Sequence, residues 1–137
     1  MFERCLYFNS NVLARKLNSR WEVAFSRYDL SPSHVYLLRV VLDKPGLTQQ
    51  TLANLLHIER STLARFVDVL EAKELVCRQC DEVDARMKVI VPSAKAEELR
   101  TELEALGDAL YKELCEKYGV KKVESLVATM REFADRF

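Results

Sequence analysis

Apolar residues recur every three or four positions over most of the chain, and breaks in this pattern divide it into segments. A first stretch runs from Cys5 to about Arg27, and a second runs from Ser33 to about Leu42. Residues spaced in this way fall on one face of a helix, so each stretch predicts an amphipathic helix. The second stretch follows Ser31-Pro32, which predicts a helix start because serine caps free N–H groups and proline suits the first helical position.

Two shorter helical patterns lie close together in the middle of the chain. The first, Gln49–Leu56, follows Thr48 as its expected N-cap, and the second runs from about Arg60 to Lys73. Only His57-Ile58-Glu59 separates them. Two short helices joined by about three residues have the size of a helix-turn-helix, in which the second helix enters the major groove of DNA.

The pattern changes to short β-prone runs after Lys73. Leu75–Gln79 and Lys88–Val91 are rich in strand-forming residues, and the polar stretch Asp81–Arg86 separates them. We expect a two-stranded hairpin here. A helix-turn-helix followed by a hairpin is the winged form of that motif, so residues 31–92 predict a winged helix-turn-helix lobe.

Leucines mark a long helical stretch after the hairpin. They recur at intervals of four, three, four and four residues from Leu99 to Leu114, a spacing that approaches a coiled-coil seam. Tyr118-Gly119 breaks the stretch, and a last helix is expected from about Lys122 to Phe137. The apolar faces of residues 1–30 and 93–137 exceed what the central lobe can cover, so we expect dimerisation helices there, with packing inside one chain as the alternative.

The composition agrees with a mainly α fold that carries a small β-hairpin wing. The 137 residues are 49% apolar and 31% charged, and they include only three Gly and three Pro. The sequence contains no run of 18 apolar residues, so no transmembrane helix is expected. Polar residues interrupt the apolar positions near Met1, whereas a secretory leader needs a continuous apolar stretch, so we do not expect one here. We therefore expect a cytoplasmic protein whose four cysteines are free thiols.

The charge is balanced. The 21 basic and 21 acidic residues give a formal net charge of zero, and residues 60–88 hold six of each. Proteins that bind DNA are often basic, so individual well-placed cations rather than a strong overall field would have to hold DNA here. The same balance favours a rival hypothesis, a winged-helix module that binds proteins and has no affinity for DNA. An enzyme is not expected, because no phosphate loop, metal cluster or nucleophile motif is present.

Short motifs along the chain match a known family pattern. The most specific is the wing sequence Asp84-Ala85-Arg86, and the others are Leu30-Ser31-Pro32, Tyr36-Leu37-Leu38, Leu47-Thr48-Gln49-Gln50 and Arg60-Ser61-Thr62-Leu63. In these motifs the chain resembles the multiple-antibiotic-resistance regulator (MarR) family. The resemblance implies a homodimeric transcription regulator that binds a pseudo-palindromic site in double-stranded DNA. It also implies a small aromatic or phenolic effector, and no cofactor.

Five positions depart from the family pattern, and three of them, Pro92, Ser93 and Ala96, stand where Leu, Thr and Gly are usual. Glu74 stands where the family usually has a glycine after the recognition helix, and a left-handed backbone would suit glycine at that point. Ala85 replaces one of two adjacent wing arginines. These changes are compatible with the winged fold but predict a weaker hold of the wing on DNA.

Polar and basic residues gather on the helix-turn-helix opposite its apolar positions. Side chains and free amides at the start of its first helix can bond phosphate, and the N-terminal positions of its second helix approach base edges. The alternative is that these side chains serve only as caps or as a solvated face. The expected DNA-binding residues on these helices are Thr48, Gln49, Gln50, Arg60, Ser61, Thr62 and Arg65.

The wing supplies the remaining DNA-binding candidates. We expect Arg86 at its tip to enter a minor groove, where narrow A·T tracts concentrate negative potential. Asp84 would orient the Arg86 guanidinium, and Arg78 and Lys88 on the strands would meet phosphates. The alternative is a hairpin tip that is held only by salt bridges.

Cysteines and aromatic residues suggest two further roles. Cys5 lies in the first helix, and one branch of the family senses peroxide through a cysteine there, while a buried small apolar residue is the alternative. The Cys77/Cys80 pair has metal-like spacing, but zinc needs four ligands, so no metal is expected. The resemblance also implies an effector cleft, for which the candidates are Tyr7, Trp21, His34, Tyr36 and Arg39.

Overall fold

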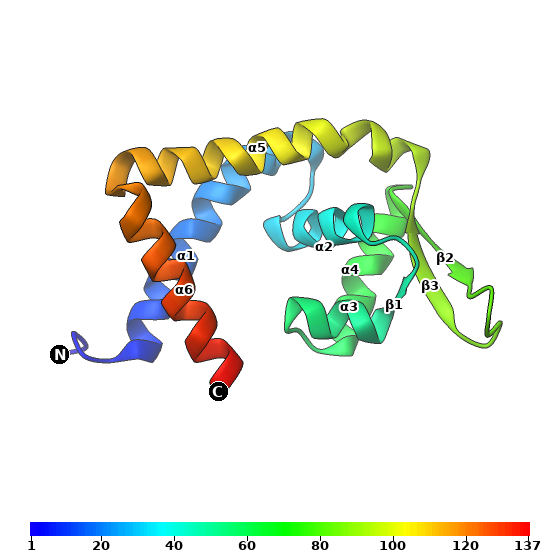
Figure 1. Cartoon of the computed structure of the whole chain (residues 1–137). Coiled ribbons are helices and arrows are strands. Elements are labelled where there is room, and N and C mark those ends of the chain that lie inside the picture. Colours follow the sequence, from blue (N-terminus) through cyan, green and yellow to red (C-terminus); the bar gives the residue numbers. More distant parts are fainter. The chain divides into compact units, whose positions relative to one another are not determined.

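The computed structural model describes all 137 residues, which form two compact units, Met1–Leu103 and Glu104–Phe137 (Figure 1). The first unit contains α1 (Leu6–Phe25), the 3-10 helix η1 (Ser26–Tyr28), α2 (Pro32–Asp43), β1 (Leu47–Thr48), α3 (Gln49–Leu56), α4 (Arg60–Ala72), β2 (Val76–Cys80), β3 (Lys88–Pro92) and the beginning of α5 (Ala94–Tyr118). The second unit contains the rest of α5 and α6 (Val120–Arg136). The expected mainly helical fold with a β-hairpin wing is confirmed, and no helix is both long and apolar enough to cross a membrane.

Two helix starts of the winged lobe, those of α2 and α3, carry the caps that the sequence predicted. The Ser31 hydroxyl accepts a hydrogen bond from the His34 N–H at 3.3 Å, and His34 Nδ1 accepts one from the Ser31 N–H at 3.3 Å, which completes a capping box. At the start of α3, Thr48 Oγ1 accepts from the Thr51 N–H at 3.2 Å. Each cap contributes about 1 kcal/mol and fixes the residue at which its helix begins.

The sheet has three strands in the order β1-β3-β2, where the sequence had predicted a two-stranded hairpin. The additional strand, β1, is only two residues long, with Leu47 opposite Ile90 and Thr48 opposite Val89. A strand of two residues shows no alternating pattern, which is why sequence analysis missed it. Its pairing fixes the start of α3 beside the wing strand β3, while the β2–β3 hairpin projects from the lobe (Figure 1).

A single apolar core holds the helix-turn-helix in place. Leu63, Val67 and Leu70 of α4 are fully buried and follow the four-then-three spacing of one helix face. Because this face is inward, the opposite face of α4 is outward. On α3, Leu52 and Ala53 are buried and face this core, while Leu55 is 43% exposed.

The end of α4 is bonded to the beginning of α5. The Ser93 hydroxyl donates to the Glu74 carbonyl at 2.7 Å and accepts from the Ala96 N–H at 3.1 Å, and Lys95 Nζ donates to the Lys73 carbonyl at 3.1 Å. These bonds satisfy carbonyls that a helix end leaves free. The position of the recognition helix is therefore tied directly to the long helix α5.

Glu74 has the left-handed backbone that its position in the sequence implied, with φ at 60°. Left-handed backbone costs a residue with a side chain roughly 1–2 kcal/mol, and glycine avoids this cost. We therefore expect Glu74→Gly to raise the free energy of unfolding by about 1 kcal/mol, since the greater freedom of glycine in the unfolded chain offsets part of the gain. Urea denaturation measures this change in the free energy of unfolding. Ala72→Gly, two residues earlier in right-handed helix, is the control and should lower stability; a loss in both variants would contradict the account.

Candidate nucleic-acid interface

A hollow of about 330 Å³ opens where the starts of α3 and α4 face the wing. We call it the basic hollow, because four of its lining side chains are cationic and none is acidic. Its lining residues are Thr48, Gln49, Gln50, Arg60, Arg78, Arg86, Met87 and Lys88. Seven of these eight are among the eleven DNA-binding residues that the sequence suggested. Met87 is the one lining residue that sequence reasoning missed, because nothing in its chemistry marks it.

The α3 side of the basic hollow is a helix N-terminus. The first N–H groups of a helix have no partner within it, and the helix dipole adds positive potential there. Thr48 Oγ1 donates to Thr51 Oγ1 at 3.0 Å, and Gln50 Nε2 donates to Asn54 Oδ1 at 3.0 Å, so both side chains are held on this end of α3. Such an end binds phosphate oxygens readily.

The recognition helix α4 presents its polar face outward. Arg60, at the first position of α4, lines the hollow, whereas Ser61 and Arg65 are exposed further along the helix. Arg65 Nη2 donates to Thr62 Oγ1 at 3.4 Å. The hollow and the outer face of α4 therefore adjoin at Arg60, and the expected α4 residues divide between the two surfaces.

Arg86 extends from the wing tip with its carboxylate neighbour beside it. Its Nε donates to Asp84 Oδ1 at 3.1 Å and its Nη2 donates to Asp84 Oδ2 at 3.4 Å. The Arg86 side chain is nevertheless 92% exposed, and its hydrogen bonds hold the pKa of the Asp84 carboxyl below its usual range. Asp84 thus orients an accessible guanidinium, which is the arrangement that we expected for this pair.

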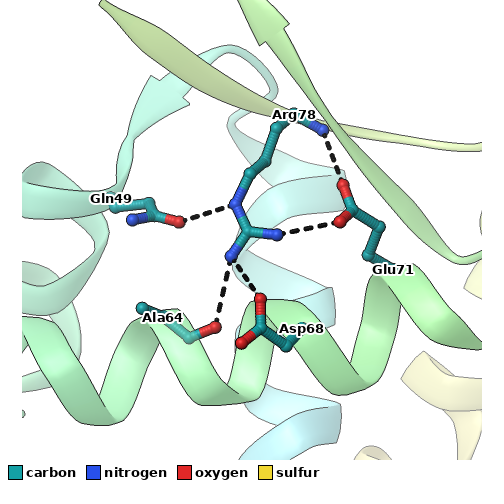
Figure 2. A network of polar contacts seen from close by, with 5 residues as sticks. All are labelled: Gln49, Ala64, Asp68, Glu71 and Arg78. Atoms are coloured by element: carbon teal, nitrogen blue, oxygen red, sulfur yellow. Dashed lines mark hydrogen bonds and ion pairs between the residues drawn. The ribbon is translucent and has the colours of Figure 1, made fainter.

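Arg78 behaves differently from the phosphate-binding cation that we expected (Figure 2). Its Nε donates to Gln49 Oε1 at 3.0 Å and its Nη1 donates to Glu71 Oε1 at 2.9 Å. Its Nη2 donates to Asp68 Oδ1 at 2.8 Å and to the Ala64 carbonyl at 3.3 Å. All three guanidinium nitrogens are therefore engaged, and only 25% of the side chain is exposed. The guanidinium is therefore bonded within the lobe, whereas the sequence suggested a side chain that meets phosphate.

The effector-cleft candidates do not form one cluster. Trp21 Nε1 donates to the Tyr36 hydroxyl at 3.0 Å, which joins α1 to α2. His34 faces the other side of α2, where its ring meets Phe66 edge-on with 4.9 Å between centroids, because residues two positions apart point in nearly opposite directions from a helix. His34 therefore stands apart from the Trp21–Tyr36 pair, and Tyr7, near the start of α1, is 79% exposed.

The packing of His34 makes stability depend on pH. Burial first, and then the nearby Lys73 charge, hold the pKa of His34 below its usual range. The unfolded chain therefore binds a proton at a higher pH than the folded protein does, and the free energy of unfolding falls as the pH is lowered through about 6.5. We expect His34→Gln, which can still complete the capping box, to lose this dependence in urea denaturation between pH 5 and pH 7. His57→Asn is the control and should keep it; an unchanged dependence in His34→Gln would refute the assignment.

The cysteines are free, and none sits with enough partners to bind a metal ion. In the single chain Cys5 is exposed at the N-cap of α1, where its sulfur accepts from the Phe8 N–H at 3.4 Å. Cys80 is exposed on β2, and Lys88 Nζ lies 3.3 Å from its sulfur. Cys77 and Cys115 are partly buried.

Comparison with known proteins agrees with this architecture. The family model described as MarR family matches residues 28–87. YybA of Bacillus subtilis (strain 168), an uncharacterized HTH-type transcriptional regulator, is 29% identical over 98 residues, which cover 71% of this chain and 65% of YybA. The transcriptional regulator HosA of Escherichia coli O157:H7 is 25% identical over 120 residues, which cover 88% of this chain and 87% of HosA. The match therefore spans slightly less than two thirds of YybA and most of HosA.

Solved structures show the same fold. The transcriptional repressor CouR bound to a 23-mer DNA duplex superposes with a TM-score of 0.89 at 19% identity, covering 97% of this chain and 94% of CouR. CouR from Rhodococcus jostii RHA1 bound to p-coumaroyl-CoA gives a TM-score of 0.84 at 21% identity, covering 98% of this chain and 94% of CouR. These matches show that the chain has a winged helix-turn-helix fold. Residues 28–87 match the MarR family, the family that the motifs had indicated.

Proposed function

We propose that the chain is a sequence-specific regulator of transcription that binds double-stranded DNA as a homodimer. The observation that carries this proposal is the basic hollow, in which Arg60, Arg86 and Lys88 meet the N-terminus of α3 without any lining carboxylate. The chain as a whole has no net charge, so this local arrangement is a departure from its average. DNA backbone is the extended anion that such a surface, flanked by an outward-facing recognition helix, fits best.

The DNA-binding residues have distinct proposed roles. The α3 start, through Thr48, Gln49 and Gln50, bonds phosphate. The outer face of α4 reads base edges in the major groove, through Arg60, Ser61, Thr62 and Arg65. In the wing, Arg86 oriented by Asp84 enters the adjoining minor groove, and Lys88 meets phosphate.

Residues 1–30 and 93–137 are proposed to form the dimer interface, with residues 31–92 as the DNA-binding lobe. Within α1 only Phe25 is buried, and within α6 no residue is buried. Large apolar side chains on both helices are therefore exposed, among them Leu6, Phe8, Met130 and Phe133. A monomer rarely leaves so much apolar surface in water, and a second copy of the same chain covers it by symmetry.

A two-fold dimer determines the form of the DNA site. Two recognition helices that lie about 34 Å apart read half-sites one helical turn apart, so the operator is a pseudo-palindrome. Because Ser93 and Lys95 bond the end of α4 to α5, a change in the dimer helices alters this spacing. We propose that an effector acts on the spacing in this way.

The proposed effector is a small aromatic or phenolic molecule. CouR, which shares the fold, has been solved with p-coumaroyl-CoA. Trp21 and Tyr36 offer an aromatic surface that carries a hydrogen-bonding hydroxyl. Oxidation of the exposed Cys5 is the alternative signal. We propose a cytoplasmic location, where a regulator that binds chromosomal DNA acts.

Selection of bound fragments from random duplex DNA tests the proposed function. We expect the purified protein to enrich one pseudo-palindromic sequence, and its binding to weaken steeply with salt. Three cations in the hollow of each protomer, counted over a dimer, give a slope of about −5 for log K against log salt concentration. A protein that retains no duplex even at low salt would overturn the proposal in favour of the protein-binding module.

A further inference from the structure

Arg78 connects the elements that would read DNA, and we propose that it is a positioning residue of the DNA interface. Its guanidinium fixes the direction of the wing relative to α4, and it turns the amide of Gln49 so that the NH₂ group faces the nucleic acid. This inference rests on the proposed function. It assigns to Arg78 a role that differs from the phosphate contact expected of a wing arginine.

The bonds of Arg78 join three elements (Figure 2). Arg78 is the middle residue of β2 and pairs with Ile90 of β3, so its backbone belongs to the wing. Its three bonding partners on α4, Ala64, Asp68 and Glu71, are four and three residues apart and so share one face of that helix. The backbone N–H of Arg78 also donates to Glu71 Oε2 at 3.3 Å. One fork-shaped side chain thus holds the wing along the recognition helix.

These bonds at the base of the wing matter because a small rotation there moves the wing tip by a larger distance. Strand residues advance about 3.3 Å each, so the wing tip lies on the order of 15 Å from Arg78, and a ten-degree change in wing direction moves the tip by about 3 Å. That displacement equals the length of a hydrogen bond. The contact of Arg86 with a groove therefore depends on bonds that are made at the base of the wing.

The charge of this cluster argues against a phosphate ligand. One guanidinium faces two carboxylates, and both carboxylates remain partly exposed, Asp68 at 66% and Glu71 at 43% of the side chain. The cluster carries a net charge of −1 and repels phosphate. If attraction for DNA were the purpose of Arg78, these two acids would oppose it, whereas they are the acceptors that a geometric role requires.

Gln49 receives its orientation from the same guanidinium. Arg78 Nε–H can only donate, so the Gln49 atom that faces it must be the oxygen. The NH₂ group then points away from Arg78 (Figure 2), and Gln49 lines the basic hollow. The opposite orientation would set two donors against each other. Arg78 thereby makes Gln49 a hydrogen-bond donor to the DNA backbone.

Arg78 could act as a phosphate ligand or as a positioning residue. Replacing its carboxylate partner Glu71 by a neutral residue distinguishes these roles, because it changes the affinity for DNA in opposite directions. If Arg78 were a phosphate ligand, Glu71→Gln would free its charge and tighten binding to DNA. If Arg78 positions the wing, Glu71→Gln should weaken binding to the selected duplex about tenfold while binding to a scrambled duplex stays equal or tightens. Glu82→Gln, which removes a wing carboxylate outside the cluster, is the matched control and should leave the ratio of the two affinities unchanged.

Two further variants complete the test. Arg78→Lys keeps the charge but cannot make the fork, so we expect it to bind the selected duplex as weakly as Glu71→Gln does. Gln49→Glu keeps an acceptor for Arg78 but removes the NH₂ group, so it should lose DNA affinity at an unchanged Tm. Tighter binding by Glu71→Gln, or wild-type affinity in either of the other two, overturns the inference. Failure of the wild-type protein to bind any duplex would instead overturn the proposed function.

Discussion

Replacement of both Arg60 and Arg86 by alanine is expected to reduce affinity for the selected duplex by at least a hundredfold. The two side chains line the basic hollow from opposite sides, α4 and the wing. A side chain that contacts a base or a groove in a specific complex contributes about 1–3 kcal/mol, which is roughly ten- to a hundredfold in affinity. The residues lie on separate elements with no bond between them, so their effects should add. Fluorescence anisotropy with a labelled duplex measures the loss.

The salt dependence of the same variants reports how each arginine acts. Loss of one phosphate contact lowers the slope of log K against log salt concentration by about 0.9 for each copy of the side chain. Lys44→Ala removes an exposed cation at the end of α2 that is part of neither the hollow nor the proposed dimer interface, and it should leave both affinity and slope close to wild type. If the double variant bound the selected duplex as tightly as the Lys44→Ala control, the basic hollow would not be the DNA surface.

A charge in the apolar face of α6 is expected to separate the dimer and, with it, to abolish binding to a two-half-site duplex. Met130 and Phe133 are 48% and 52% exposed in the single chain, so Met130→Lys leaves the protomer core intact. Burial of an unpaired ammonium at an interface costs several kcal/mol, and two-fold symmetry imposes this cost twice. Sedimentation equilibrium should show a monomer at micromolar concentration, and affinity for the selected duplex should fall at least a hundredfold.

The matched control for this variant lies on the same helix. Ser125 is exposed and points away from the apolar face of α6, so Ser125→Lys adds the same charge without burying it. It should remain dimeric and bind DNA as the wild-type protein does. A dimeric Met130→Lys variant would contradict the proposed interface, and a monomeric variant with wild-type affinity would contradict the two-half-site mechanism.

Local chemistry made much of the fold predictable. Ser31-Pro32 and Thr48 marked two helix starts because capping depends only on neighbouring residues, and the structure shows both caps. The apolar spacing of α4 fixed which face turns inward, and therefore which face carries the candidate DNA-reading residues. The Asp84–Arg86 pair was predictable for the same reason, since its partners are two residues apart.

Contacts between segments that are distant in the chain could not be predicted from the sequence. Strand β1 forms only because β3, some forty residues later, lies beside it. The bonds of Arg78 come from three segments, and residue type alone suggested a phosphate ligand, since an arginine near a wing can serve either role. The family resemblance implied an effector cleft with both His34 and Tyr36 among its candidates, but helical geometry directs these two side chains to opposite sides of α2.

The most direct test of the DNA interface is a photochemical cross-link from within the basic hollow. Met87 lines the hollow, is 46% exposed and makes no charged contact, so a benzophenone-bearing amino acid in its place reports on what occupies the hollow without removing a cation. Irradiation with the selected duplex should give a covalent protein–DNA adduct that competitor duplex and high salt suppress. Absence of this adduct from DNA-bound protein, with adducts forming instead from the same probe at Tyr118 on α5, would contradict the account.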